Sequence, residues 1–274
     1  MPRPPERGSL PLVLALKLLL TPLLVGGSAL VARRWGPAIG GWLIALPLTS
    51  GPVLAFLVVD HGVPFASAAA VGSLTGLAAI SCFSLAYAWS ARRGAPAGPW
   101  ASLAAAAIAF FASGSLLAAI LGSAPLPVAV AVLGSIAVAG RAIRRSGVVH
   151  RPIPYPRWDI PARMAIATVL VVGLTSVAPL LGAGPSGLVA TFPVYVSVLT
   201  AFTHHHAGPV AATDVLAGLL AGLYGTAGFY LVVIALLVPA GPVAAFVAAV
   251  ATALAIQAVA LRRTLRSGVE PEPA

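Results

Sequence analysis

Long apolar runs alternate along the chain with short segments that hold its glycines, prolines and charges. Each run lasts about 20 residues, the length of a helix that crosses a bilayer. Backbone polar groups in hydrocarbon need partners within the protein, and a barrel would alternate apolar with polar positions, so these runs predict helices. We expect nine of them, at about 10–32, 38–59, 64–89, 100–122, 126–143, 162–181, 186–203, 209–237 and 242–261.

The composition excludes a soluble globular protein. Hydrophobic residues make up 59% of the chain and charged residues 8%, whereas a soluble domain carries about 25% charged residues. A single cysteine, Cys82, rules out a disulfide scaffold. We therefore expect an all-α polytopic membrane protein whose main partner is the lipid bilayer.

The formal net charge of +10 is concentrated after particular apolar runs. With nine spans, all of these basic clusters fall on one side, which the positive-inside rule assigns to the cytoplasm. This predicts an outside N-terminus and a cytoplasmic C-terminus, and it disfavours nucleic-acid binding. Richness in Ala, Gly, Pro and Arg is typical of GC-rich bacteria, so we expect the bacterial cytoplasmic (inner) membrane. The clusters are Arg33-Arg34, Arg92-Arg93, the segment from Arg141 to Arg157, and Arg262, Arg263 and Arg266.

An internal repeat is the strongest signal in the sequence. When the chain is shifted by 146 positions without gaps, residues 24–77 match residues 170–223 at 16 of 54 positions. Chance would give about five or six matches in a chain of this composition, so the repeat indicates a duplication. The matches include Pro47 with Pro193, and they also pair many glycines.

The repeat makes the first four spans equivalent to the last four, with the fifth span as the connection. An odd number of crossings separates equivalent helices, so the two copies should insert in opposite directions. We therefore expect two inverted four-helix repeats plus a connecting helix: a first repeat at 1–122, a connecting helix with a basic cytoplasmic loop at 123–160, and a second repeat at 161–274 with a short disordered tail.

The second and seventh spans each contain a proline at the matching position. Proline removes a backbone donor and opens or kinks a helix, and the freed groups near the bilayer midplane can bind a substrate or ion. The alternative is a simple kink, with Ser and Thr bonding back to their own helix. The predicted substrate-binding residues are Pro47, Thr49, Ser50, Gly51, Pro193, Tyr195 and Ser197.

The two interrupted segments read GGWLIALPLTSGP and SGLVATFPVY. Their pairing resembles that of uncharacterised bacterial multi-pass membrane proteins, and the resemblance covers most of the chain. The resemblance implies a membrane protein with an internal inverted repeat, and it implies no particular activity.

Asp214 is the acidic residue placed most clearly inside a span, on the helix face of Gly218 and Gly222. An ionisable residue in this setting is a functional candidate. We name Arg163 as its partner, and Asp214 as a possible carrier of a coupling proton. A counterpart pair, Lys17 with Asp60, is expected at the other side. The alternative interpretation is a structural ion pair at the interface.

Two further motifs have mainly structural interpretations. Small residues four apart, Gly72 with Gly76 and Gly218 with Gly222, predict closely packed helices. The consecutive histidines 204–206 cannot all point one way, so we expect no metal site, and a pH-sensitive loop or a polar helix end stays open.

These features favour a secondary transporter or exporter of a small neutral or zwitterionic solute, or of a small anion, that needs no cofactor. No Walker A or GxSxG sequence is present, which disfavours ATP-driven transport and serine hydrolysis. One alternative is a non-catalytic membrane subunit or assembly factor that docks a partner through the basic loop at 141–157. A second is an integral membrane enzyme. Homo-oligomerisation or a membrane partner stays open.

Overall fold

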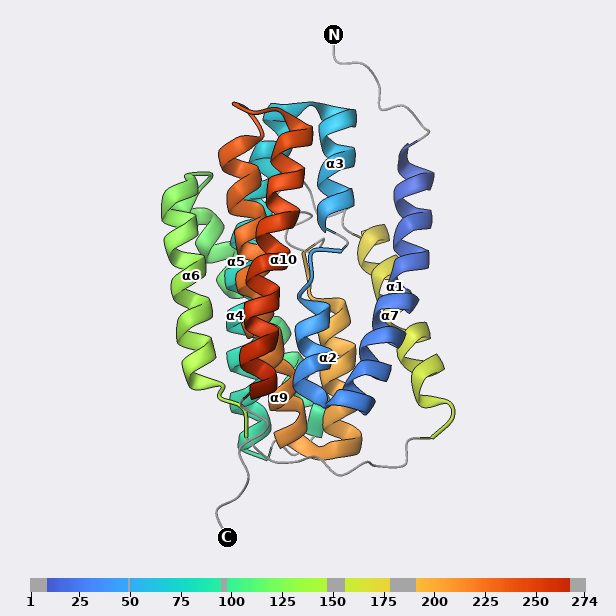
Figure 1. Cartoon of the computed structure of the whole chain (residues 1–274). Helices are drawn as coiled ribbons and strands as arrows, with labels where there is room; N and C mark the ends of the chain where they lie inside the picture. Colours follow the sequence, from blue (N-terminus) through green and yellow to red (C-terminus); the bar gives the residue numbers. More distant parts are fainter. Residues whose placement is uncertain (1–8, 49, 95–97, 147–155, 178–190, 267–274) are drawn as a thin grey trace.

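The computed structural model describes residues 9–48, 50–94, 98–146, 156–177 and 191–266, and all regular structure among them is helical (Figure 1). The helices are α1 (Ser9–Trp35), α2 (Pro37–Ile44), α3 (Ser50–His61), α4 (Val63–Arg92), α5 (Gly98–Leu121), α6 (Pro125–Ala142), α7 (Asp159–Val177), α9 (Val194–Leu236) and α10 (Pro242–Arg266).

The described helices follow the predicted apolar runs, except that the run at 38–59 is divided into α2 and α3 and the start of the run at 186–203 lies outside the described residues. Five of the helices are long and apolar enough to cross a membrane. This confirms the all-helical membrane class. The five are Val63–Arg92, Gly98–Leu121, Pro125–Ala142, Val194–Leu236 and Pro242–Arg262.

α9 combines two of the predicted elements. At 43 residues a straight helix would measure about 65 Å, twice the thickness of the hydrocarbon core. Gly208, with φ 83° and ψ 175°, breaks the helical conformation and turns the chain back. Gly62 adopts nearly the same conformation, φ 84° and ψ 169°, between α3 and α4. Only glycine accepts this conformation without strain, and in both places a proline follows within two residues.

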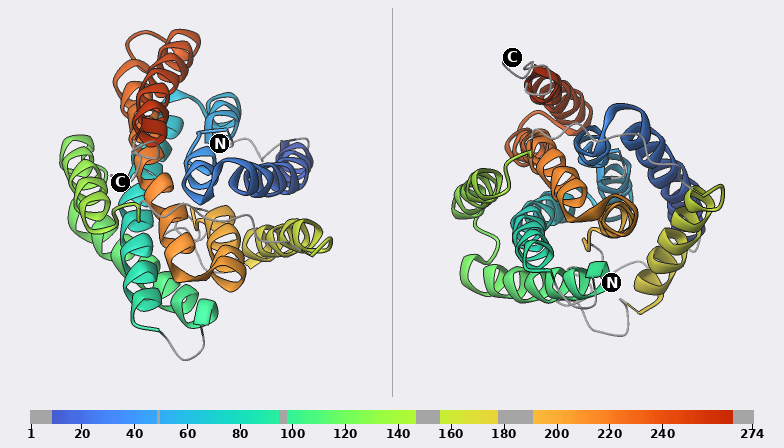
Figure 2. Two further views of the ribbon diagram at one scale, coloured as in Figure 1. Left: turned by 60° about the horizontal axis from the view of Figure 1, so that its bottom comes forward. Right: turned by 90° about the horizontal axis from the view of Figure 1, so that it is seen from below.

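α9 lies at the centre of the bundle and the other helices surround it (Figure 2). α2, α4 and α10 make its most extensive contacts. α5 packs along α4 in the same way that α10 packs along α9, while α1 packs between α2 and α7. α6 bridges α4 and α9.

Exposed apolar side chains cover the outside of this bundle. Ile108 of α5, Leu126 of α6 and Val243 of α10 are 70%, 74% and 79% exposed. α4 and α9, by contrast, bury most of their side chains. Water would penalise so large an apolar surface, whereas lipid tails match it.

The ends of the helices give the bundle one basic end. α1, α4, α6 and α10 all finish at the lower end of Figure 1. The last turns of α1, α4 and α6 carry Arg33, Arg34, Arg92 and Arg141. The basic residues that end α1, α4 and α6 therefore lie at the same end of the molecule.

Glycines let α2 and α9 approach closely. A Cβ on Gly218 would overlap the carbonyl oxygen of Ala38, and one on Gly222 would lie 2.5 Å from the Cβ of Ala45. Gly41 of α2 likewise faces the backbone of α9. The predicted close packing at Gly218 and Gly222 is thus confirmed.

The equivalent glycines on α4, Gly72 and Gly76, differ from each other in how closely they are packed. A Cβ on Gly76 would lie 3.2 Å from the Cβ of Thr191, so this glycine is tightly packed. Gly72 is exposed. The expectation of close packing is therefore correct at Gly76 and wrong at Gly72, which faces outward from the described part of the bundle.

We predict that Gly218→Ala destabilises the protein because the new methyl group collides with the backbone of α2, which cannot move aside as a side chain would. Overpacking of this kind costs about 1–3 kcal/mol. The matched control is Gly134→Ala in α6, where the added methyl meets no described atom within 4 Å. Thermal unfolding of the purified chain in detergent should show a lower midpoint for the first variant only; equal midpoints would contradict the close crossing.

Candidate functional site

The first break lies between α2 and α3. α2 ends at Ile44, and α3 begins at Ser50. The amide of Leu48 donates to the carbonyl of Leu46 across Pro47 (2.8 Å), as in a γ-turn. The carbonyl of Pro47 then accepts from the amide of Gly51 (3.1 Å), which starts the next helix.

The second break lies just before α9 and repeats this pattern. The amide of Val194 donates to the carbonyl of Phe192 (2.8 Å) across Pro193. Pro193 has φ −80° and ψ 64°, close to the ideal inverse γ-turn. Its carbonyl accepts from the amide of Ser197 (3.0 Å) as the helix begins. Each proline thus starts a helix with its own carbonyl.

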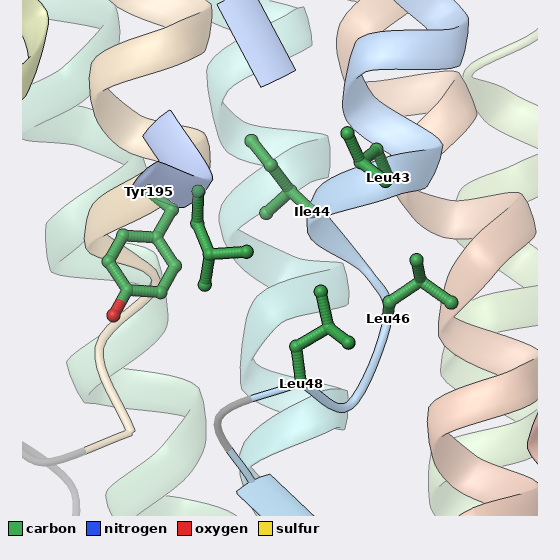
Figure 3. A pocket seen from close by; sticks show the side chains of 6 residues that line it. Leu43, Ile44, Leu46, Leu48 and Tyr195 are labelled. Carbon is green, nitrogen blue, oxygen red and sulfur yellow. The ribbon is translucent and has the colours of Figure 1, made fainter. Parts of the chain in front are cut away.

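The two breaks border one small pocket. Figure 3 shows Tyr195 on one side and the side chains around the end of α2 on the other. The cavity measures about 20 Å³, room for roughly one water molecule. All of its lining side chains are uncharged. They are Leu24, Leu43, Ile44, Leu46, Leu48 and Tyr195.

A polar side chain from α9 closes the end of α2. The hydroxyl of Thr226, which is buried, donates to the carbonyl of Ala45. Nearby, the carboxamide nitrogen of Gln257 donates to the carbonyl of Gly222 (2.8 Å). Gln257 is 2% exposed, and its Oε1 has no hydrogen-bond partner among the described residues. Neither side chain was predicted from the sequence, although a glutamine inside an apolar span is itself a signal.

The predicted hydroxyls of the second break already have partners. The Tyr195 hydroxyl lies 3.2 Å from the Oγ1 of Thr21 on α1. The Ser197 hydroxyl donates to the carbonyl of Pro193 (2.8 Å), which is the own-helix bond of the simpler alternative. Thr49 and the side chain of Ser50 lie outside the described residues.

The structure gives Asp214 a different partner from the predicted one. The backbone amide and hydroxyl of Ser146 donate to its two carboxylate oxygens at 2.8 and 2.7 Å. Arg163 instead binds Asp159 through its Nε at 2.8 Å. The expected Asp214–Arg163 pair is therefore wrong. Asp159 lies four residues before Arg163 on one helix face, so this local pair forms within α7 itself.

Asp159 is the centre of a buried charge cluster near the basic end. Arg33 of α1 approaches its Oδ2 at 2.5 Å, on the same oxygen as Arg163. His206 of α9 lies 3.0 Å from its Oδ1. The carboxylate is fully buried, so it joins α1, α7 and α9 through one charge. The i, i+4 spacing of Asp159 and Arg163 was visible in the sequence and could have pointed to this cluster.

The counterpart pair at the opposite end stays a prediction. Asp60 is exposed near the end of α3. Lys17 belongs to α1, and its side chain lies outside the description.

The three consecutive histidines point to different partners. His204 Nδ1 lies 3.2 Å from the hydroxyl of Tyr87 on α4, His205 is exposed, and His206 faces Asp159. His204 and His206 therefore serve separate contacts, and His205 packs its ring against that of His206.

No protein-family model, curated protein or solved structure matches this chain. The candidate site therefore rests on the geometry above.

We predict that Thr226→Val lowers stability by about 1 kcal/mol, because it leaves the carbonyl of Ala45 without its donor in an apolar setting. Thr75→Val is the matched control: Thr75 is similarly buried, but its hydroxyl bonds to Val71 of its own helix. Denaturant titration of both purified variants measures the difference. A cost for Thr75→Val as large as that for Thr226→Val would show that the cross-helix bond contributes nothing.

We also predict a large loss of stability for Asp159→Asn, since it leaves two arginines near a buried site without their counter-charge. Breaking a buried pair costs about 3–5 kcal/mol. Asp60→Asn, the same change at an exposed carboxylate, should leave the thermal midpoint nearly unchanged. Similar midpoints for the two variants would show that Asp159 does not stabilise the protein as the counter-charge of the two arginines.

Proposed function

We propose that the protein is a secondary transporter or exporter of a small solute that works by alternating access around the two proline breaks. The observation that carries this proposal is that breaks 146 positions apart share one hydrogen-bond pattern and border one pocket. Paired discontinuous helices that meet around a binding site are a common plan of secondary transporters.

The proposal includes two inverted repeats related by a pseudo-two-fold axis. A two-fold axis exchanges contacts between the copies, and two contacts of this kind support it. Gly222 packs against Ala45, while Gly76, the equivalent of Gly222, packs against Thr191, the equivalent of Ala45. The matching torsions of Gly62 and Gly208 support the same relation.

The proposed topology has nine crossings in the bacterial cytoplasmic membrane. The N-terminus would lie outside and the C-terminus in the cytoplasm, because the helices that carry basic last turns all finish at one end. In Figure 1, α1 begins at the opposite end from the one where α10 finishes, as an odd number of crossings requires.

The proposed substrate is small and neutral or zwitterionic, or a small anion held by backbone amides. An uncharged lining favours this class over a cation or a large polar solute. A cavity of about 20 Å³ fits only water, so we assign this conformation to a closed state. Binding then requires the breaks at Pro47 and Pro193 to separate.

The charge cluster around Asp159 suits a gate at the basic end. Ion pairs join Arg33 of α1 and Arg163 of α7 to Asp159, and His206 of α9 contacts the same carboxylate; these contacts must break before the helices part. Lys17 and Asp60 would serve the opposite end, since Lys17 is the repeat equivalent of Arg163 and Asp60 that of His206. Protonation of Asp214 would weaken both of its bonds to Ser146, and this is the proposed route for proton coupling.

The decisive experiment needs no known substrate. In a Cys82→Ser background, Leu46→Cys places one thiol in the pocket, and Ile108→Cys places one on the lipid-facing surface of α5. Membrane vesicles of both orientations are treated with a membrane-impermeant thiosulfonate. Alternating access predicts that the thiol at position 46 reacts from both sides and that the thiol at position 108 reacts from neither.

Labelling at position 46 from neither side would overturn the transport proposal. The breaks would then be packing devices, as in a non-catalytic membrane subunit.

A further inference from the structure

A groove runs between α4 and α6 near the basic end of the bundle. Its volume is about 520 Å³, many times that of the pocket at the breaks and large enough for part of a lipid. Four residues of α4, its C-cap Arg93 and one residue after α6 describe its chemistry. Leu85, Ala86 and Trp89 form apolar walls, while Arg92 and Arg93 belong to its basic lining at the end of α4; Ile143 follows α6.

The two arginines are held in place at the groove. The guanidinium carbon of Arg93 lies 3.9 Å from the centre of the Trp89 ring, a cation–π contact. Nη2 of Arg92 donates to the carbonyl of Ala142 at 3.2 Å, which ties α4 to the end of α6. A guanidinium has five N–H donors, so both side chains keep donors for an anion.

The surroundings add to the positive charge. Arg141 and Arg144 are both exposed where α6 ends. The groove therefore combines apolar walls along the helices with a basic end at the level where a bilayer places its headgroups. A free phosphate would satisfy the arginines but leave the apolar walls uncovered, whereas a phospholipid satisfies both.

We propose that this groove binds an anionic phospholipid, with the phosphate between Arg92 and Arg93 and an acyl chain along Leu85 and Trp89. The bound lipid would fasten α6 to α4. Because α6 also packs against α9, the lipid would stabilise the junction between the two halves of the chain. This inference stands independently of the transport proposal.

Native mass spectrometry of the purified full-length chain tests it, with phosphatidylglycerol and phosphatidylcholine as competing probes. We expect wild type to prefer phosphatidylglycerol by roughly ten- to thirtyfold, the amount two basic contacts supply. Arg92→Gln/Arg93→Gln should abolish the preference. Arg34→Gln is the matched control, since Arg34 lies near the ring of Trp35 at the same end of the bundle but outside the groove; it should keep the preference.

A second variant removes the lipid without touching charge. Ala86→Trp should fill the groove and reduce phosphatidylglycerol binding at least tenfold, and it decides the question if the double arginine variant fails to fold. Equal binding of both lipids by wild type, or an unchanged preference in Ala86→Trp, would overturn the proposal. Displacement of the lipid by millimolar inorganic phosphate would also overturn it, because the groove would then bind the anion alone.

Discussion

A helix that is interrupted inside a membrane must find partners for the backbone groups that it releases, because hydrocarbon offers none. The two breaks of this protein depend on that constraint. Each proline sits in a turn of minimal size and starts the next helix with its own carbonyl. At the end of α2, the hydroxyl of Thr226 supplies one further donor. The glycines of α9 allow this contact, since any side chain at Gly218 would hold the two helices apart.

The turns at the two prolines were predictable because proline acts locally. Pro47 and Pro193 each predict a break at their own position, and the 146-residue repeat indicates that the two positions are equivalent. Which polar groups meet there was not predictable. Thr226 reaches the first break, and Gln257 reaches Gly222 of α9, only through the crossing of these helices, which depends on tertiary packing and not on spacing along the chain.

The charged residues likewise make some contacts that local spacing predicts and others that depend on tertiary packing. Arg163 lies on the face of Asp159 four positions earlier, and local geometry decides its partner. Arg163 was expected to pair with Asp214 because both were expected near one side of the membrane. Asp214 instead accepts bonds from Ser146, just beyond α6, a contact that no periodicity indicates. Proximity to one membrane surface is therefore too coarse a criterion for pairing charges.

The central claim is that the two breaks face each other, and intramolecular cross-linking in native membranes tests it most directly. In a Cys82→Ser background, Leu48→Cys and Tyr195→Cys place one thiol in the pocket from each break. A short bis-thiosulfonate should join them, and it should not join Leu48→Cys to Ile108→Cys. Equal yields for the two pairs, or no product from either, would show that the breaks do not meet.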